Sequence, residues 1–234
     1  MARKKSSKSS QNKPAFLFDL DGTLVDSVYQ HVVGWAEALH ERGIELSVWR
    51  VHRRVGMSDG VILSALQREI GRKLDQRELE KLKLLHSEAF QRQLSEVRPT
   101  PGARELLAEL SDLHIPWAIA TSGTAQGTKK VLEVLDLDRV PPVVTSEDVP
   151  HGKPFPDLFL AAANLLKVEA SDCIVVGDSV WDLLASRRAH ALGVGLLCGG
   201  YGMDELEQAG AYRVYEDPAE LIRHLDELGV QTET

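Results

Sequence analysis

The stretch AFLFDLDGTLVDS, residues 15–27, decides the fold of this chain. Four apolar residues run directly into Asp19 and Asp21, which are separated by one leucine and followed by Gly22 and Thr23. Two like charges at the end of an apolar run repel each other, and burial without a partner costs free energy. The stretch therefore predicts a buried strand whose two carboxylates lie beside a cation.

Short apolar runs alternate with helical patterns along most of the remaining chain. This alternation is typical of an α/β domain with a Rossmann-like core, in which strand–helix units build a parallel sheet. Each run is too short for a helix, and most are rich in valine, isoleucine or aromatic residues. The predicted strands are AFLF (15–18), WAIAT (117–121), PVVT (142–145), CIVVG (173–177), LGVGLL (192–197) and YRVY (212–215).

Residues 28–97 interrupt the alternation. They carry helical apolar stripes, such as Val28, Val32 and Trp35, and no convincing strand. VRPTPG, residues 97–102, is typical of a linker. We therefore predict a helical cap of residues 28–97, inserted after the first strand of a core that residues 15–27 and 98–234 form.

The first 14 residues differ in charge from the rest of the chain. They contain five basic residues and no acid, although the net charge of the 234-residue chain is −8. A basic Ser/Lys tail can contact nucleic acid or a membrane surface, but no aromatic residue accompanies it, and we interpret residues 1–14 as a disordered tail. The acidic remainder argues against nucleic acid as the main partner. The basic residues are Arg3, Lys4, Lys5, Lys8 and Lys13.

Composition indicates an ordinary globular protein, with 43% hydrophobic and 26% charged residues. No apolar run approaches the ~20 residues of a membrane span, and the N-terminus lacks the apolar segment of a signal peptide. We therefore expect a cytoplasmic protein without a membrane partner, as a monomer or weak dimer. Cys173 and Cys198 show no metal or redox spacing, and we interpret them as core residues in a reducing compartment.

Polar residues follow four of the predicted strands. In an open parallel sheet, ligands bind at the carboxyl ends of the strands, so these residues should converge on one edge. They are Asp19 and Asp21 after the first strand, Thr121, Ser122 and Gly123 after the second, Lys153 beyond the third, and Asp178 and Asp182 after the fourth.

Each of these residue types suits phosphoryl chemistry. A carboxylate is ionised at neutral pH and needs no base beside it to act as a nucleophile. Carboxylates also suit Mg²⁺, which would neutralise the paired aspartates and bind a phosphate oxygen. A lysine stabilises the negative charge that develops during phosphoryl transfer. The hydroxyl of Thr121 and the backbone N–H groups of Ser122 and Gly123 can hold further phosphate oxygens.

Each motif alone also has a structural explanation. Asp-Gly pairs commonly form turns, Thr121-Ser122-Gly123 could cap a helix, and an isolated Lys153 would be a solvated surface residue. An EF-hand is excluded because Leu24 and Val25 occupy positions where that loop needs acids. The four motifs occur in order and each follows a strand, which favours a functional site.

These motifs resemble those of the haloacid dehalogenase superfamily. FDLDGTLVDS, the strand end at Thr121, GKPFPD and VVGDSVWD are similar to its four motifs, and the helical insert resembles its C1 cap. Residues 200–221 are similar to the C-terminal part of phosphoglycolate-phosphatase-like members. The resemblance spans residues 15–228 and implies Mg²⁺-dependent hydrolysis of a small-molecule phosphate monoester, such as a sugar phosphate or phosphoglycolate.

The resemblance also implies roles for single residues. Asp19 would be the nucleophile, and Asp21 would protonate the leaving oxygen and then activate water. Mg²⁺ would bind the carboxylates of Asp19 and Asp178 and the backbone carbonyl of Asp21, with Asp182 supporting the metal shell. The phosphoryl group would be held by Thr121, Lys153, Ser122 and Gly123.

His31 raises the question of a phosphatase or a mutase. It lies twelve residues after Asp19 and resembles the cap histidine of β-phosphoglucomutase, although a partly buried structural histidine fits as well. The Gly-Thr of the first motif, the Gly-Asp of the fourth, and His86 near the position of the mutase's cap lysine favour a phosphatase. A β-phosphoglucomutase-like phosphomutase is the alternative.

Two further possibilities concern the class of protein and its substrate contacts. A phosphoaspartate signalling module or a non-catalytic phosphate-binding domain is disfavoured, because a long-lived phosphoaspartate has no use for a hydrolytic base such as Asp21.

HRRVGMSDG, residues 52–60, resembles the substrate-facing segment of the cap. There Arg53 or Arg54 could meet a substrate anion and Gly56 could allow close approach, while solvated arginines are the alternative.

Overall fold

The computed structural model describes residues 13–231, so residues 1–12 of the predicted tail lie outside the described residues. A six-stranded sheet forms the core, in the order β5-β4-β1-β6-β7-β8, and every neighbouring pair is parallel. The prediction of an α/β fold with a parallel sheet is confirmed. The strands are β1 (Ala15–Phe18), β4 (Trp117–Ala120), β5 (Val143–Val144), β6 (Cys173–Gly177), β7 (Leu192–Leu196) and β8 (Ala211–Tyr215).

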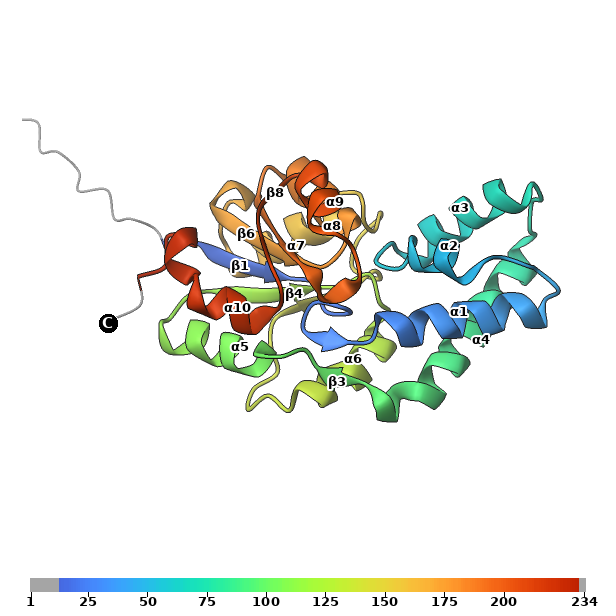
Figure 1. The fold of residues 1–234 in the computed structure, drawn as a ribbon, viewed down its shortest axis with the longest axis horizontal. Helices are drawn as coiled ribbons and strands as arrows, with labels where there is room; N and C mark the ends of the chain where they lie inside the picture. The colour runs from blue at the N-terminus through green and yellow to red at the C-terminus, as the bar shows by residue number, and fades with distance from the viewer. Residues whose placement is uncertain (1–12, 232–234) are drawn as a thin grey trace, which may run out of the picture.

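Helices cover both faces of this sheet (Figure 1). Successive side chains of β1 point to opposite faces, so Phe16 and Phe18 pack with one group of helices and Leu17 with the other. Both faces are therefore buried, which explains why β1 is apolar throughout. The first face carries α5 (Ala103–Asp112), α6 (Ala125–Leu135) and α10 (Pro218–Arg223), and the second carries α7 (Asp157–Leu166), α8 (Val180–Ala189) and α9 (Met203–Ala209).

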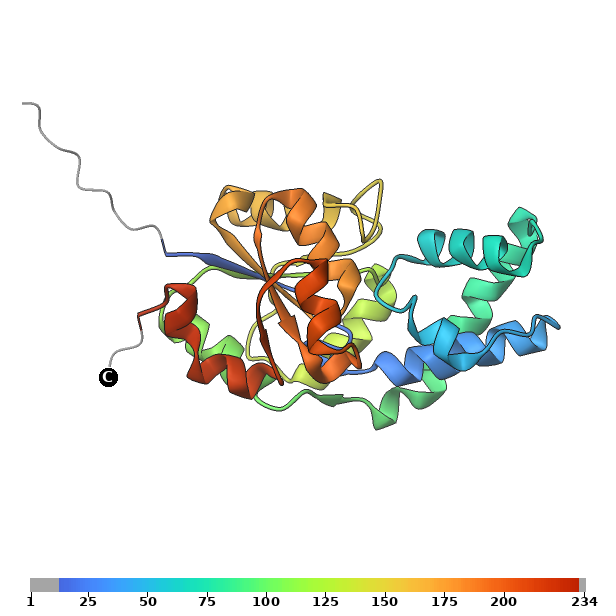
Figure 2. The same ribbon diagram turned by 45° about the horizontal axis from the view of Figure 1, so that its top comes forward.

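A helical segment extends from one end of the core, as Figures 1 and 2 both show. We call this segment, residues 28–97, the insert. Its apolar stripes meet in a cluster of their own, which includes Val32, Trp35, Leu66 and Leu82. The insert consists of α1 (Val28–Glu41), α2 (Val48–His52), α3 (Asp59–Ile70), α4 (Gln76–Gln93) and the short 3₁₀ helix η1 (Leu94–Glu96).

The two chain crossings between core and insert lie side by side. β2 (Val25–Asp26) and β3 (Arg98–Pro99) pair as a two-stranded antiparallel ribbon. The hydroxyl of Thr100 donates to the carbonyl of Thr23 at 2.7 Å, which fastens the second crossing to the first. This ribbon was not predicted, because strands of two residues are too short to show a periodicity in the sequence.

Short 3₁₀ turns complete the core: η2 (Ala170–Asp172), η3 (Leu197–Gly199) and η4 (Leu225–Leu228).

Of the helices in residues 13–231, none has the length and apolar character needed to cross a membrane.

Candidate active site

The carboxyl ends of β1 and β6 meet because the two strands are neighbours and parallel. Asp19 directly follows β1, and its backbone N–H donates to the carbonyl of Val176 at 2.9 Å. Asp178 directly follows β6. Asp182 lies in the first turn of α8, where its carboxylate accepts from the backbone N–H of Ser179 at 3.2 Å in a capping box.

Lys153 joins these aspartates from the loop between β5 and α7. The side chain is fully buried, 0% exposed, which rules out the solvated lysine considered above. Its ammonium lies 2.7 Å from Oδ1 of Asp182 and pairs with Asp19 as well. Thr23 also contributes, since its hydroxyl donates to Oδ1 of Asp178 at 2.8 Å. The site therefore holds three buried carboxylates against one buried ammonium.

Burial and mutual repulsion perturb the ionisation of this group. Burial raises the pKa of Asp19 to about 7, although Lys153 opposes the change. Burial also raises the pKa of Asp178, with the charges of Asp182 and Asp19 adding to the effect. Burial alone would lower the pKa of Lys153, but Asp182 and Asp19 outweigh it and raise it above its ordinary value. Three carboxylates facing one ammonium favour the binding of a further cation at this site.

The donor set fits Mg²⁺. Carboxylate oxygens of Asp19, Asp178 and Asp182 all lie within 4.8 Å of one another, and hard oxygen donors are those that Mg²⁺ prefers. Gly199 leaves room beside this group, because a Cβ there would collide with the carboxylate of Asp178. The carboxylate of Asp21 stands outside the cluster, so only its backbone carbonyl remains available for the predicted metal contact.

Asp21 turns its side chain toward the insert. Its Oδ1 accepts from the hydroxyl of Ser27 at 2.7 Å and lies 3.3 Å from Nε2 of His31. Burial would raise the pKa of Asp21, but His31 and Ser27 outweigh it and the pKa is lowered. The two aspartates of the first motif therefore occupy different electrostatic environments, as two different chemical roles require.

His31 belongs to an aromatic group at the base of the insert. Its ring stacks on Phe90 with 3.9 Å between centroids, and Nδ1 lies 3.1 Å from Nε2 of His86. His86 in turn stacks on Trp35 at 4.2 Å. Burial, and secondarily the charge of His31, lower the pKa of His86 well below its ordinary value, so this ring is neutral and its Nε2 can accept a hydrogen bond from Nδ1 of His31.

Of the residues that follow β4, Thr121 makes its contact within the core and Ser122 makes its contact with the insert. The backbone N–H of Gly123 donates to the hydroxyl oxygen of Thr121 at 3.0 Å, which leaves the Thr121 proton free for another acceptor. Ser122 donates to the carbonyl of Gly56 at 3.0 Å. The hydroxyl of Ser122 therefore joins the insert to the core, and its predicted phosphate contact can come only from the backbone.

The cap residues predicted to touch substrate are otherwise engaged. Gly56 has a φ of +96°, and a Cβ there would lie 2.8 Å from the hydroxyl oxygen of Ser179, so its close approach is to the core. Arg53 pairs with Glu205 across the interface. Arg54 pairs with Glu69 inside the insert. Each arginine of this loop therefore has a carboxylate partner in this structure, and contact of either one with a substrate anion stays a prediction.

Three polar residues beside the aspartates or at the contact with the insert were not predicted to belong to the site. His52 lies with Nε2 3.0 Å from the carbonyl of Gly199, and Ser179 and Thr23 support the aspartates as described. The threonine of the first motif and the serine of the fourth stand next to the aspartates in the sequence, which was the available signal. His52 opens the segment HRRVGMSDG that was predicted to face substrate, but its contact could not be predicted because its partner lies 147 residues away.

Comparison with known proteins agrees with this geometry. Residues 13–190 match the haloacid dehalogenase-like hydrolase family. The chain belongs to this family. Hexitol phosphatase A of Escherichia coli is 33% identical over 183 residues, covering 76% of this chain and 82% of that protein. Phosphoglycolate phosphatase of Neisseria gonorrhoeae is 31% identical over 218 residues, covering 92% and 91%.

A solved structure extends the similarity of this haloacid dehalogenase-like hydrolase to the whole fold. The crystal structure of a hydrolase from Pseudomonas syringae has a TM-score of 0.90 and 49% sequence identity, and the match covers 92% of this chain and 99% of that one. The family makes the chain a hydrolase, and its similarity to named phosphatases indicates phosphatase activity.

Proposed function

We propose that this protein is a Mg²⁺-dependent phosphatase that hydrolyses a small-molecule phosphate monoester through an aspartyl-phosphate on Asp19. The observation that carries this proposal is the buried ion pair between Lys153 and both Asp19 and Asp182. It places a fixed cation at the nucleophile, where phosphoryl transfer develops negative charge. Similarity to phosphatases of a hexitol phosphate and of phosphoglycolate supports a sugar phosphate or phosphoglycolate-like substrate.

In the first step, a carboxylate oxygen of Asp19 attacks phosphorus while the bond from phosphorus to the ester oxygen breaks. Asp21 donates its proton to the leaving oxygen, so the alcohol departs neutral. Thr121 and the backbone N–H of Ser122 hold the phosphoryl oxygens, and Lys153 offsets their charge. The N–H of Gly123, predicted to hold phosphate as well, donates to the Thr121 oxygen in this structure and orients that hydroxyl. The product of this half-reaction is phosphorylated Asp19.

In the second step, ionised Asp21 takes a proton from water, and the hydroxide formed attacks the phosphorus. The bond to Asp19 breaks, inorganic phosphate leaves, and both aspartates return to their starting states. His31 and Ser27 contact Asp21 and lower its pKa, which favours the base form that this step needs. The proton that Asp21 takes from water here is the one that it donates to the leaving oxygen in the next turnover. Asp19, Asp178 and the carbonyl of Asp21, with support from Asp182, would hold Mg²⁺, which would supply positive charge against the carboxylates and the phosphoryl group.

The test is phosphate release from p-nitrophenyl phosphate and a panel of sugar phosphates, with Mg²⁺ and with a chelator. We expect turnover only with the divalent ion. Asp19→Asn should abolish it, because the amide keeps the size of the side chain but lacks the anionic nucleophile. Activity of this variant within tenfold of the parent would refute covalent catalysis at Asp19.

One observation favours a second candidate, a β-phosphoglucomutase-like phosphomutase. The contact between His31 and Asp21 sets an insert histidine at the position where a base could prepare a sugar hydroxyl for attack. A mutase needs water excluded while an intermediate reorients. The phosphatase remains the first proposal because the relatives described above are named phosphatases and the sequence departs from the mutase pattern at His86, although a β-phosphoglucomutase of Bacillus subtilis is also 28% identical over 188 residues.

A further inference from the structure

Two polar side chains of the insert have no part in the proposed mechanism. Ser58 and Asp59 lie where the loop after α2 enters α3, and both are partly buried. Ser58 precedes the helix but makes no side-chain capping bond. Within residues 13–231, Asp59 makes no ion pair and only longer-range electrostatic contacts. A hydroxyl and a carboxylate thus stand side by side, both unpartnered in the described part of the chain.

Their loop rests on the edge of the sheet that carries the candidate active site. The carbonyl of Gly56 accepts from Ser122, which follows β4. Ser58 packs against Gly152, the neighbour of Lys153, so closely that a Cβ at Gly152 would collide with it. In Figures 1 and 2 the loop between α2 and α3 reaches back from the insert to the core. Ser58 and Asp59 therefore border the site.

Asp59 interacts electrostatically with residues of α1 and α4. Burial raises the pKa of Asp59, while His31 and Lys83 oppose this change and Glu80 adds to it. The carboxylate is therefore close enough to His31 to feel its charge. Lys83, on α4, is paired with Glu80 at 3.1 Å.

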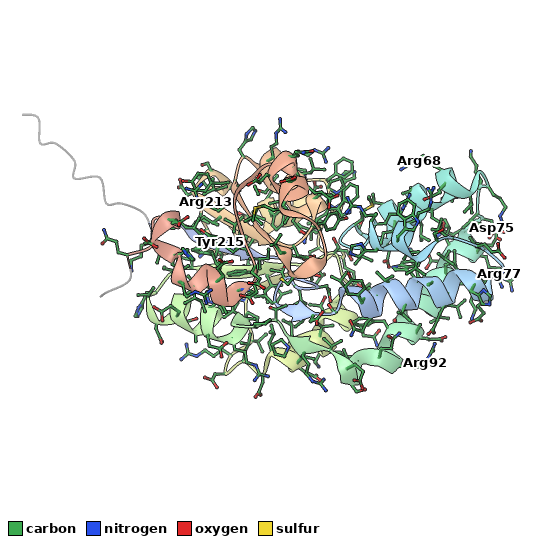
Figure 3. All side chains as sticks on the ribbon, in the orientation of Figure 1. Arg68, Asp75, Arg77, Arg92, Arg213 and Tyr215 are labelled. Atoms are coloured by element: carbon green, nitrogen blue, oxygen red, sulfur yellow. The ribbon has the colours of Figure 1, made fainter. Side chains whose placement is uncertain are left out.

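Basic side chains near this edge are already neutralised. Arg53 pairs with Glu205 and Arg54 with Glu69. The exposed arginines Arg68 and Arg77 lie toward the end of the insert that is farther from the core, and Arg92 lies on the lower side of the insert in Figure 3, where it pairs with Glu37. The N-terminal end of α3 could attract an anion through its partial positive charge, but Asp59 occupies the first helical position and cancels that attraction.

We propose that Asp59 sets the charge preference of the site, so that the enzyme selects phosphate esters whose leaving group bears hydroxyl or amino groups and no second anion. This inference rests on the proposed phosphatase function, which it narrows. A carboxylate accepts hydrogen bonds from hydroxyls, attracts an ammonium group and repels a carboxylate or a second phosphate. The hydroxyl of Ser58 can donate to or accept from a substrate hydroxyl beside it. Phosphoglycolate, whose leaving group carries a carboxylate, should accordingly be a poor substrate.

A matched pair of substrates tests the inference. Sorbitol 6-phosphate and 6-phosphogluconate share one carbon chain and differ in a CH₂OH against a carboxylate at the far end. We expect kcat/KM to favour sorbitol 6-phosphate by about tenfold or more, the scale of one charge–charge contact at a partly buried site. Asp59→Asn should shrink this ratio by at least about threefold, Asp59→Lys should shrink it further, and Asp59→Glu should preserve it.

Glu41→Gln is the matched control, because Glu41 is an exposed carboxylate at the far end of α1. Its substrate ratio should equal that of the parent. Both substrates are assayed on one preparation, so a fraction of misfolded protein cancels from each ratio. A parent ratio near one, a preference for 6-phosphogluconate, or a ratio that Asp59→Asn leaves unchanged overturns the inference and leaves the phosphatase standing. If no ester, p-nitrophenyl phosphate included, is hydrolysed with Mg²⁺, the proposed function fails and this inference fails with it.

Discussion

Nε2 of His31 lies 3.3 Å from Oδ1 of Asp21. His31 belongs to α1 of the insert and Asp21 to the loop after β1, so the insert reaches the residue that we expect to carry the proton. The carboxylate is held between this ring and Ser27. The position of the insert and the ionisation of Asp21 are therefore linked.

His31→Ala should lower kcat/KM for the preferred sugar or polyol phosphate more than for p-nitrophenyl phosphate. The aryl ester has a good leaving group that hardly needs protonation, and it makes few contacts with the insert. We expect a difference of at least about tenfold between the two substrates, within the range of general acid catalysis. Equal losses on both substrates would show that His31 acts only by maintaining structure.

Lys153→Ala should lower kcat by about 10²–10³-fold, since the transferring phosphoryl group loses its fixed cation. The change also leaves Asp19 and Asp182 without their buried partner, so the melting temperature should fall unless Mg²⁺ is present. Thermal unfolding with and without Mg²⁺ measures the second effect. A variant with near-parental turnover would contradict the role of the ion pair in catalysis.

His86 should make the protein less stable in mild acid. Its pKa is lowered in the folded state by burial, so below about pH 6.5 the unfolded chain binds a proton that the folded chain does not. The free energy of unfolding should then fall by up to about 1.4 kcal/mol per pH unit from this group. Urea unfolding at pH 7.5, 6 and 5 gives the slope.

The matched variant for this prediction is His86→Phe, which keeps an aromatic ring against Trp35 but cannot titrate. Its stability should depend less steeply on pH below 6.5 than that of the parent. Identical slopes in both proteins would mean that His86 protonates equally well in the folded state.

The insert should move relative to the core during turnover. Asp19 and Asp178 are each only 3% exposed, so substrate cannot reach them in this arrangement without an opening motion. Rotation should occur near Asp26–Ser27 and residues 97–102. Crystals grown with and without a phosphate analogue should show different angles between insert and core, and identical angles would count against the motion.

Phosphorus NMR separates the phosphatase from the mutase. With β-glucose 1-phosphate and a trace of the bisphosphate, we expect free phosphate to accumulate and no glucose 6-phosphate to form. Glucose 6-phosphate appearing faster than phosphate would replace the phosphatase proposal with the mutase.

The sequence sufficed for the parts of the fold that depend on local pattern. The bounds of β1 and β6 agree with the predicted runs, because a strand buried on both faces is apolar throughout and its end is marked by the first charge. The positions of Asp19, Asp178 and Lys153 were predicted because ligands bind at the carboxyl ends of the strands in an open parallel sheet. These three side chains converge because of the order of the strands in the sheet, and the order of the motifs along the chain indicated this arrangement.

Pairings across the chain could not be predicted in this way. Arg54 is held by Glu69 because two helices of the insert pack together, and Arg53 meets Glu205 across 152 residues. The contact between His31 and His86 likewise depends on how α1 and α4 pack. Single-sequence patterns report which face of an element is apolar, and they do not report which polar side chains meet once the faces are buried.

The ribbon of β2 and β3 has a consequence for how such an enzyme can change over evolutionary time. Because the chain leaves the core and returns to it at paired positions, the insert is attached at a single point, as a lid on one hinge. Replacing everything beyond that point leaves the sheet, the aspartates and Lys153 where they are. Substrate choice and bond-breaking chemistry thus reside largely in separate parts of the chain, and a new specificity needs a new lid that keeps the contact of His31 with Asp21, not a new catalytic centre.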